Sequence, residues 1–177
     1  MDGQLTAVGV NITDRVVVKL KPVLPQNFLI DPVATTVEDA MGVAIDEFVS
    51  KHSVELLQEQ GVYNEAYIES AAPDSDLEPD QDLTLYNDDK VRLTKYYGLV
   101  PRELLENEGV DVEEDSMYVE AIVVIANGGT LLKAEANPYM MNDRPVVAFP
   151  WDVVPGRFWG RGVCEKGYNS QKALDTE

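Results

Sequence analysis

The chain has 177 residues, of which 45% are hydrophobic, enough to fill the core of one domain or of one domain with a small appendage. Its 14 Lys and Arg residues stand against 32 Asp and Glu residues, and the net charge of −18 would repel nucleic acid phosphates, so stable direct DNA binding is not expected. A single cysteine (Cys164) and a single histidine (His52) exclude an internal disulfide framework and a Cys/His metal cluster, and no apolar run approaches the ~20 residues of a membrane helix.

Met1-Asp2-Gly3-Gln4 lacks the basic-then-apolar order of a signal peptide, so we expect no secretion by that route.

The first residues predict a β-hairpin. Two apolar stretches follow within residues 4–22, and the Asn-Ile-Thr-Asp sequence of residues 11–14 between them suits a turn. Prolines then indicate an extended segment, because proline cannot donate to a strand ladder; they are Pro22, Pro25 and Pro32.

Two short helices are predicted next. Residues 35–39, Thr-Thr-Val-Glu-Asp, are typical of a capping box, so a helix is expected to begin there. The apolar residues of 41–49 fit both a helical stripe and a strand, and Gly42 favours a short helix followed by a strand. Residues 53–60 predict the second helix, with Gly61 where a left-handed C-terminal cap is expected.

The middle of the chain contains two acidic segments. Residues 69–89 hold eight acids and no Lys or Arg, which predicts an exposed loop or a partly disordered insertion. Residues 90–98 alternate as a strand, and residues 101–105 begin a short helix with proline at its first position. A second acidic loop is expected over residues 110–116.

The clearest structural signal is a β-hairpin over residues 117–136. Two apolar stretches, 117–126 and 130–136, flank Asn127-Gly128-Gly129, which readily adopts the positive φ angles of a tight turn.

The C-terminal part is expected to contain a strand, a loop and a helix. Residues 144–149 predict the strand, and residues 150–162 a loop rich in Gly, Pro and aromatic residues. Residues 168–177 look like the opening of a helix, and about two turns are too short to be stable alone. We therefore expect this helix to continue in the natural protein.

An acidic ladder in the first loop has the alternate spacing of a calcium loop; its members are Asp74, Asp76, Glu78, Asp80 and Asp82. Such a loop needs glycine at its sixth position and a bidentate Glu at its twelfth, where this chain has Pro79 and Leu85. The ladder is therefore interpreted as a solvated loop, and no metal site is predicted.

Enzymatic motifs are also incomplete. Gly156, Gly160 and Gly162 lack the endings of a phosphate-binding or a dinucleotide-binding loop. His52 has no partner motif for nucleophilic catalysis, and no pair of acids stands in an apolar, aromatic context that would separate two pKa values. We predict that the protein is not an enzyme and needs no cofactor.

Aromatic and basic residues gather within residues 149–168. Buried protein interfaces concentrate aromatic residues and arginine, so this segment is a candidate subunit interface. An ordinary core corner with exposed arginines remains an equal alternative, whereas the acidic surroundings disfavour a nucleic-acid platform. The candidate interface residues are Trp151, Arg157, Phe158, Trp159, Arg161 and Tyr168.

Residues 150–163, Pro-Trp-Asp-Val-Val-Pro-Gly-Arg-Phe-Trp-Gly-Arg-Gly-Val, and residues 168–174, Tyr-Asn-Ser-Gln-Lys-Ala-Leu, resemble portal proteins of short-tailed bacteriophages. In that family a Gly-Arg-Phe-Trp/Tyr-Gly turn leads into a long helix. Residues 23–31 are similar to the family's Pro-Glu-Asp-Phe-Leu-Ile segment, with Gln26-Asn27 in place of Glu-Asp, and residues 34–40 to the turn that follows it. The resemblance covers roughly residues 22–177.

The resemblance implies a wing-type segment of a portal subunit, located at the portal vertex of the virion and assembled in the host cytoplasm. A portal is a ring of identical subunits, so the implied partners are other portal subunits, capsid and scaffolding proteins, terminase and tail proteins, and translocating double-stranded DNA without sequence specificity. The isolated chain is expected to be a monomer, because its charges repel and the long stem helices of a full portal are absent.

The expected fold class is α+β, mainly antiparallel strands and hairpins with a few short helices and long acidic loops. A β-rich domain is expected over residues 1–167, with the start of a longer helix at residues 168–177. The alternative function is an acidic adaptor module that binds a basic protein and has no portal role.

Overall fold

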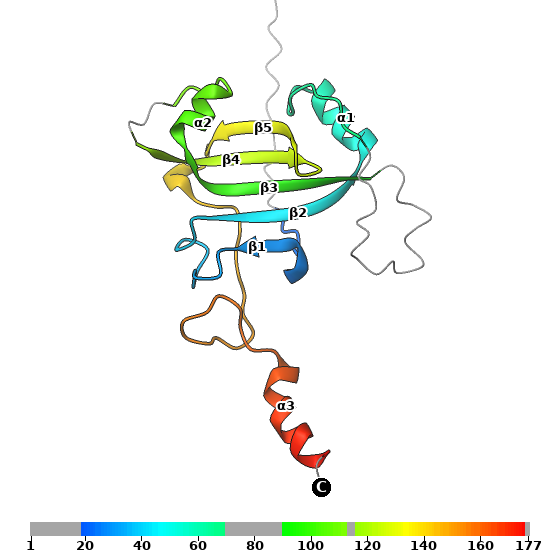
Figure 1. The fold of residues 1–177 in the computed structure, drawn as a ribbon, viewed down its shortest axis with the longest axis vertical. Helices are drawn as coiled ribbons and strands as arrows, with labels where there is room; N and C mark the ends of the chain where they lie inside the picture. Colours follow the sequence, from blue (N-terminus) through cyan, green and yellow to red (C-terminus); the bar gives the residue numbers. More distant parts are fainter. Residues whose placement is uncertain (1–18, 70–89, 113–115, 176–177) are drawn as a thin grey trace, which may run out of the picture.

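The computed structural model describes residues 19–69, 90–112 and 116–175, and its centre is one five-stranded sheet (Figure 1). The strands are antiparallel and lie in chain order, each hydrogen-bonded to the next along the sequence. They are β1 (Phe28–Ile30), β2 (Gly42–Ser50), β3 (Lys90–Pro101), β4 (Tyr118–Ala126) and β5 (Thr130–Ala136).

Two of the three short α-helices pack on this sheet, and the third lies away from it. The α-helices are α1 (Lys51–Glu59), α2 (Arg102–Asn107) and α3 (Val163–Leu174), and single 3-10 turns stand at η1 (Pro25–Asn27) and η3 (Met140–Asn142). The α+β class with mainly antiparallel strands is confirmed. In Figure 1, α1 and α2 lie at opposite ends of the sheet, while α3 projects away from it beyond β1.

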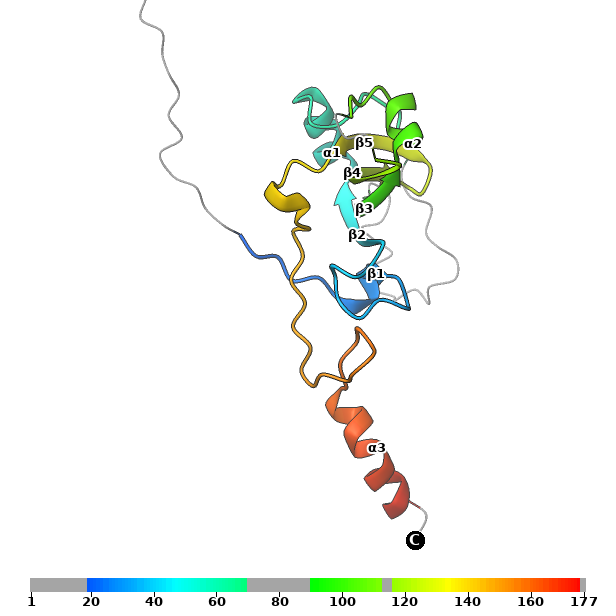
Figure 2. The same ribbon diagram turned by 90° about the vertical axis from the view of Figure 1, so that its left-hand side faces the viewer.

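The strand register decides which side chains share a face, because directly paired residues point to the same side. Val43, Leu93 and Val124 share the face that α1 covers, which we call the α1 face. Val100 and Val119 share the opposite face with α2, which we call the α2 face. Figure 2 shows the two helices on opposite sides of the sheet.

The apolar core is divided among these surfaces. On the α1 face, Val54 of α1 packs against Val91, Leu93 and Val124, and all four are almost fully buried. Leu132 joins them from β5, where a register shift opposite Val124 and Ile125 leaves it without a direct strand partner. A smaller core under α2 holds Leu105, Val112, Val119 and Ala121.

The predicted hairpin over residues 117–136 is confirmed as β4 and β5. Asn127 (φ 49°) and Gly128 (φ 73°) adopt the left-handed region that the turn sequence allows. Asn127 also fixes the turn to its neighbours: its Oδ1 accepts from the amide of Arg92, and its Nδ2 donates to the carbonyl oxygen of Glu69 at 2.7 Å. A local sequence signal is thus reinforced by contacts with a third strand.

Two further predicted helices are confirmed with small shifts of their bounds. The one predicted over residues 53–60 is α1, which begins two residues earlier because Ser50 is its cap and accepts a hydrogen bond from the amide of Ser53. Gly61 follows it at φ 71°, as a C-terminal cap requires. The helix predicted at residues 101–105 is α2, and the strand predicted over residues 90–98 is β3, which runs on to Pro101.

The helix predicted to begin at Thr35 is wrong. Residues 35–40 form turns, and β2 starts at Gly42. The capping-type contacts are present, since the Thr36 hydroxyl accepts from the Asp39 amide at 3.1 Å. The carbonyl oxygens of Val37 and Ala40 accept hydrogen bonds from Arg144, and the chain enters β2 before a full helical turn can form.

The strand predicted over residues 144–149 is also wrong. This segment crosses the α1 face instead of extending the sheet, and the Val146 amide donates to the Arg144 carbonyl in a tight local turn. Pro145 and Pro150 have no N–H to give to a ladder. The final helix, predicted from residue 168, begins at Val163 as α3.

Some predictions concern segments outside the described residues. They are most of the hairpin over residues 4–22, most of the acidic loop of residues 69–89, and the centre of the loop of residues 110–116. Among the residues that the structure does describe, no helix combines the length and the apolar character needed to cross a bilayer.

Candidate functional site

The candidate site lies on the chain segment between η3 and α3, residues 143–162, which we call the strap. Figure 2 shows the strap leaving the sheet on the α1 side and running past β1 to α3. Two anchors attach it to the sheet, an arginine cluster at its beginning and an aromatic stack near its end. Each anchor joins residues that are far apart in the sequence.

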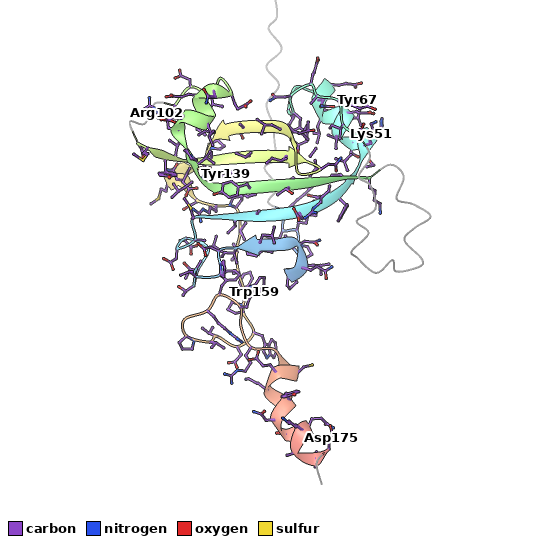
Figure 3. The ribbon with its side chains drawn as sticks, in the orientation of Figure 1. Lys51, Tyr67, Arg102, Tyr139, Trp159 and Asp175 are labelled. Atoms are coloured by element: carbon purple, nitrogen blue, oxygen red, sulfur yellow. The ribbon has the colours of Figure 1, made fainter. Side chains whose placement is uncertain are left out.

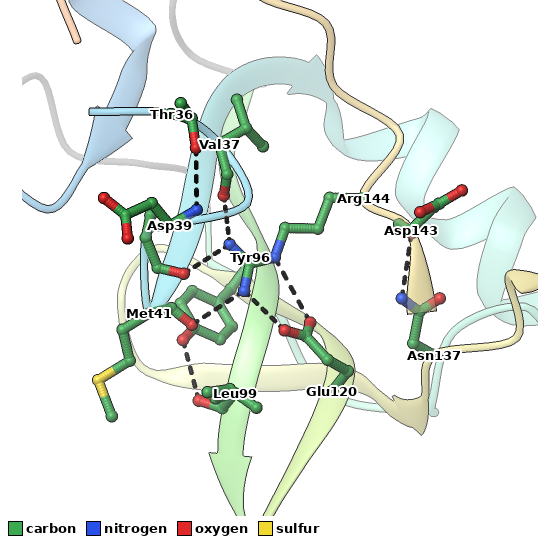
Figure 4. A network of polar contacts seen from close by, with 11 residues as sticks. Thr36, Val37, Asp39, Met41, Tyr96, Leu99, Glu120, Asn137, Asp143 and Arg144 are labelled. Carbon is green, nitrogen blue, oxygen red and sulfur yellow. Dashed lines mark hydrogen bonds and ion pairs between the residues drawn. The ribbon is translucent and has the colours of Figure 1, made fainter. Parts of the chain in front are cut away.

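The first anchor is Arg144, whose guanidinium lies in a pocket of carbonyl and carboxylate oxygens (Figure 4). Its Nη1 donates to the carbonyl oxygens of Val37 at 2.6 Å and Ala40 at 2.7 Å. Its Nη2 donates to Glu120 Oε1 at 2.6 Å and to the carbonyl oxygen of Met41 at 3.3 Å. The side chain of Arg144 is only 7% exposed and that of Glu120 16%, so this ion pair is largely withdrawn from water.

This cluster holds three parts of the chain together: the strap, the turn before β2, and β4. Arginine suits the position because its planar guanidinium can donate hydrogen bonds to several oxygens at once. A glycine pair lies beside it, Gly42 on β2 opposite Gly98 on β3. The ring of Tyr96 covers Gly42 so closely that a Cβ there would stand 2.2 Å from the Tyr96 hydroxyl oxygen.

The second anchor is an aromatic stack on β1. The rings of Phe28 and Phe158 are stacked with centroids 5.6 Å apart, and Trp159 meets both rings edge-on at 6.1 and 5.1 Å. Figure 3 shows Trp159 between β1 and the start of the loop that leads to α3. Beside the stack lies an apolar pocket of about 230 Å³, which is lined by Val23, Pro25 and strap residues including Val146, Phe149 and Pro150.

Between Pro150 and Gly162 the strap makes a closed loop. The Arg161 amide donates to the Asp152 carbonyl oxygen at 2.8 Å, which brings the two ends of the loop together. Gly160 is needed at this crossing, because a Cβ there would lie 2.8 Å from the same carbonyl oxygen. Gly156 turns the far end of the loop at φ 82°.

Ion pairs join this loop to α3. Arg157 donates to both carboxylate oxygens of Glu165, at 3.0 and 3.2 Å, and Lys166 pairs with Asp152 at 2.8 Å. The hydrogen bond from Lys166 lowers the pKa of Asp152. These pairs are exposed and individually weak, and none of the residues of α3 is buried. The helix is therefore held to the loop and not to the core.

The strap carries exposed apolar side chains at alternate positions, two before the closed loop and two at its start. We call these four residues the outer row: Val147 (69% exposed), Phe149 (89%), Trp151 (85%) and Val153 (71%). Single exposed apolar residues are ordinary, but four large apolar side chains exposed within seven residues form an apolar patch.

A separate polar cluster lies on the α1 face. Glu47 accepts hydrogen bonds from Lys95, at 2.9 Å, and from Lys21. Burial raises the pKa of the Glu47 carboxyl, but the two lysines outweigh this effect and the net shift is downward. Burial lowers the pKa of Lys95, but the hydrogen bond to Glu47 and the charges around Lys95 together outweigh burial, and the net shift is upward. The cluster fastens the segment before η1 to β2 and β3.

The six predicted interface residues divide into three groups. Phe158 packs with the core around Phe28, and Trp159 caps the stack. Arg157 and Arg161 face Glu165 at the start of α3. Trp151 on the strap and Tyr168 on α3, 63% exposed, point away from the core.

Sequence reasoning missed three residues that organise this site. Arg144 was placed in a strand, and Glu120 lies 24 positions before it, so no local pattern links them. Phe28 carries a local signal as part of the Pro-x-x-Phe segment, but nothing in that segment indicates Phe158 as its partner.

The chemistry of the site is apolar contact and ion pairing. Within residues 19–69, 90–112 and 116–175 no group of three His, Cys, Asp or Glu side chains is placed to hold a metal ion. A family model described as Phage SU10 portal protein matches residues 2–174, nearly the whole chain. No curated protein matches it.

Proposed function

Because the chain belongs to the Phage SU10 portal protein family, we propose that it forms part of the ring of subunits at the capsid vertex through which DNA is packaged and ejected. It is a structural protein of the phage portal, and the family is structural, not enzymatic. In this proposal the sheet is the rigid body of a wing-type segment, and the strap and α3 are the parts that meet other subunits.

The solvent exposure of the strap and of α3 supports this proposal. A helix of 12 residues without a buried side chain is marginal in water, and α3 has no such side chain. The strap next to it exposes the four apolar residues of the outer row. Contacts with neighbouring subunits would bury both and stabilise the helix.

The candidate interface follows from the same geometry. We propose that Trp151 and Tyr168 contact neighbouring subunits directly, because both are exposed and aromatic. Phe158 and Trp159 position the loop by stacking on Phe28. Arg157 and Arg161 set the direction of α3 through Glu165.

The remaining partners belong to the proposal as well. They are capsid and scaffolding proteins, terminase and tail proteins, and DNA that passes without sequence recognition during assembly in the host cytoplasm. The net charge of −18 suits a conduit, because a negative surface keeps DNA from adhering as it moves.

The proposal is tested on the portal protein as the phage encodes it, by electron microscopy and mass photometry of the purified particle. The wild type is expected to form closed rings. The double variant Trp151→Ala/Tyr168→Ala is expected to shift the population to free subunits, whereas Tyr67→Ala, an aromatic of similar exposure beside α1, should leave the rings unchanged. A wild-type protein that forms no ring, or rings insensitive to the double variant, would contradict the proposal.

The 177-residue chain alone provides a second measurement. We expect it to be a monomer by light scattering, because its charges repel one another. A stable ring of the chain alone would show that this expectation is wrong.

A further inference from the structure

The outer row needs an apolar surface to cover it. Val147 and Phe149 border the apolar pocket beside the aromatic stack, while Trp151 and Val153 lie at the start of the closed loop. The exposed fractions, from 69% to 89%, mean that most of this surface is left uncovered by the chain itself. Exposed apolar patches of this kind mark contacts with other proteins.

A second apolar surface lies on the other side of the sheet. On the α2 face, the register places Leu29, Ala44, Tyr96 and Val123 in one row across four strands. Ile125 and Leu131 form the next row on β4 and β5. Leu29 is 50% exposed, and the other five are partly exposed.

Within the described residues, α2 covers only one end of this face, where Leu105 packs on Val119 and Ala121. The polar groups at its centre are already satisfied by one another: Asp46 accepts from Arg92 at 2.5 Å and from Thr94 at 2.6 Å. An apolar partner can therefore cover the face without leaving a buried carboxylate unpaired.

The two surfaces lie on opposite sides of the same sheet, as Figure 2 shows for the strap and α2. A symmetric dimer uses one patch twice, whereas a ring needs two different patches that fit each other on successive subunits. The largely apolar α2 face and the exposed apolar side chains of the outer row are such a pair.

The charges agree with this pairing. The strap, residues 143–162, contains three Arg and two Asp, a net charge of +1 in a chain whose total is −18. The α2 segment, residues 101–112, has one basic residue, Arg102, against four acids: Glu103, Glu106, Glu108 and Asp111. Its net charge is −3. A contact between the strap of one copy and the α2 face of another therefore brings opposite charges together.

We propose that the outer row of one copy docks on the α2 face of the next copy, so that successive subunits join head to tail. This inference rests on the proposed ring function and names the two surfaces that would form the ring. The strap is then a connector, held to its own sheet by Arg144 and Phe158 and to the neighbouring sheet by its outer row.

The test uses cysteine cross-linking in the portal protein as the phage encodes it, after Cys164→Ser removes the exposed native thiol. The double variant Val153→Cys/Leu29→Cys is treated with a short bismaleimide and separated by denaturing electrophoresis. We expect a ladder that extends beyond the dimer to the full ring, because each subunit then carries both halves of the contact. A mixture of the two single variants should give dimers and no larger species.

The control pair is Val153→Cys/Leu56→Cys, because Leu56 is 40% exposed but belongs to α1 on the opposite side of the sheet. It should give at least tenfold less ladder. Dimers from Val153→Cys alone would mean that straps pair with straps and would overturn the inference. Closed rings without a ladder from the first pair would also overturn it, while leaving the proposed ring function intact. Absence of any ring would defeat both.

Discussion

The buried ion pair between Arg144 and Glu120 provides the sharpest test of how the strap is held. The substitution Arg144→Met keeps an apolar stem but removes every donor of the guanidinium. Glu120 then remains largely buried without its cation, and the carbonyl oxygens of Val37 and Ala40 lose the partner that they have in this structure. We expect this variant to fold with reduced stability.

The size of the effect follows from the burial. Removing one member of a buried ion pair costs about 3–5 kcal/mol, because the other charge remains out of water. With a urea m-value of about 2 kcal/mol/M, the midpoint should fall by about 1.5–2.5 M. The exposed pair of Arg157 with Glu165 is the matched control, and Arg157→Met should cost less than about 1 kcal/mol.

Urea unfolding should be followed by two probes. Both tryptophans, Trp151 and Trp159, lie on the strap, so their fluorescence reports its detachment, while far-ultraviolet circular dichroism reports the sheet. In Arg144→Met we expect the fluorescence transition to precede the dichroism transition. Adding Glu120→Gln should recover part of the loss, because the neutral amide no longer buries a charge. A loss no larger than that of Arg157→Met would refute the reasoning.

Three further substitutions test other contacts. Gly42→Ala should destabilise the chain by about 1–3 kcal/mol, because its Cβ would meet the Tyr96 ring, whereas Gly129→Ala, with no atom within 4 Å of the added Cβ, should change the urea midpoint little. Glu47→Gln should lower the stability at pH 7 but not at pH 3. Folding lowers the pKa of Glu47, so the charged carboxylate stabilises the protein above the pKa of the unfolded state. This contribution is lost as the pH falls through the pKa of the folded state. An equal effect at both pH values would exclude a charge contribution. Phe158→Ala should lower the stability by about 2 kcal/mol, because the stacking with Phe28 is lost. Trp151→Ala should leave the thermal midpoint of the isolated chain unchanged, because Trp151 is exposed. Equal effects of the two substitutions would contradict the distinction between the aromatic anchor and the outer row.

Local sequence signals predicted the elements whose causes are local. The turn Asn127-Gly128-Gly129 defines its hairpin because few residues adopt positive φ without strain, and α1 is framed by Ser50 and Gly61 for equally local reasons. Composition and motifs together also indicated the α+β class and the portal family.

The path of the strap across the sheet is determined by tertiary contacts. Its apolar residues 146–149 have the composition of a strand, yet they cross a sheet face because Arg144 reaches oxygens on a turn more than 100 residues away. The same contact joins the strap to residues 35–40, which form turns although their capping pattern favours a helix. A guanidinium buried among oxygens outweighs local propensities, which amount to less than about 1 kcal/mol per residue, and no sequence window contains both partners.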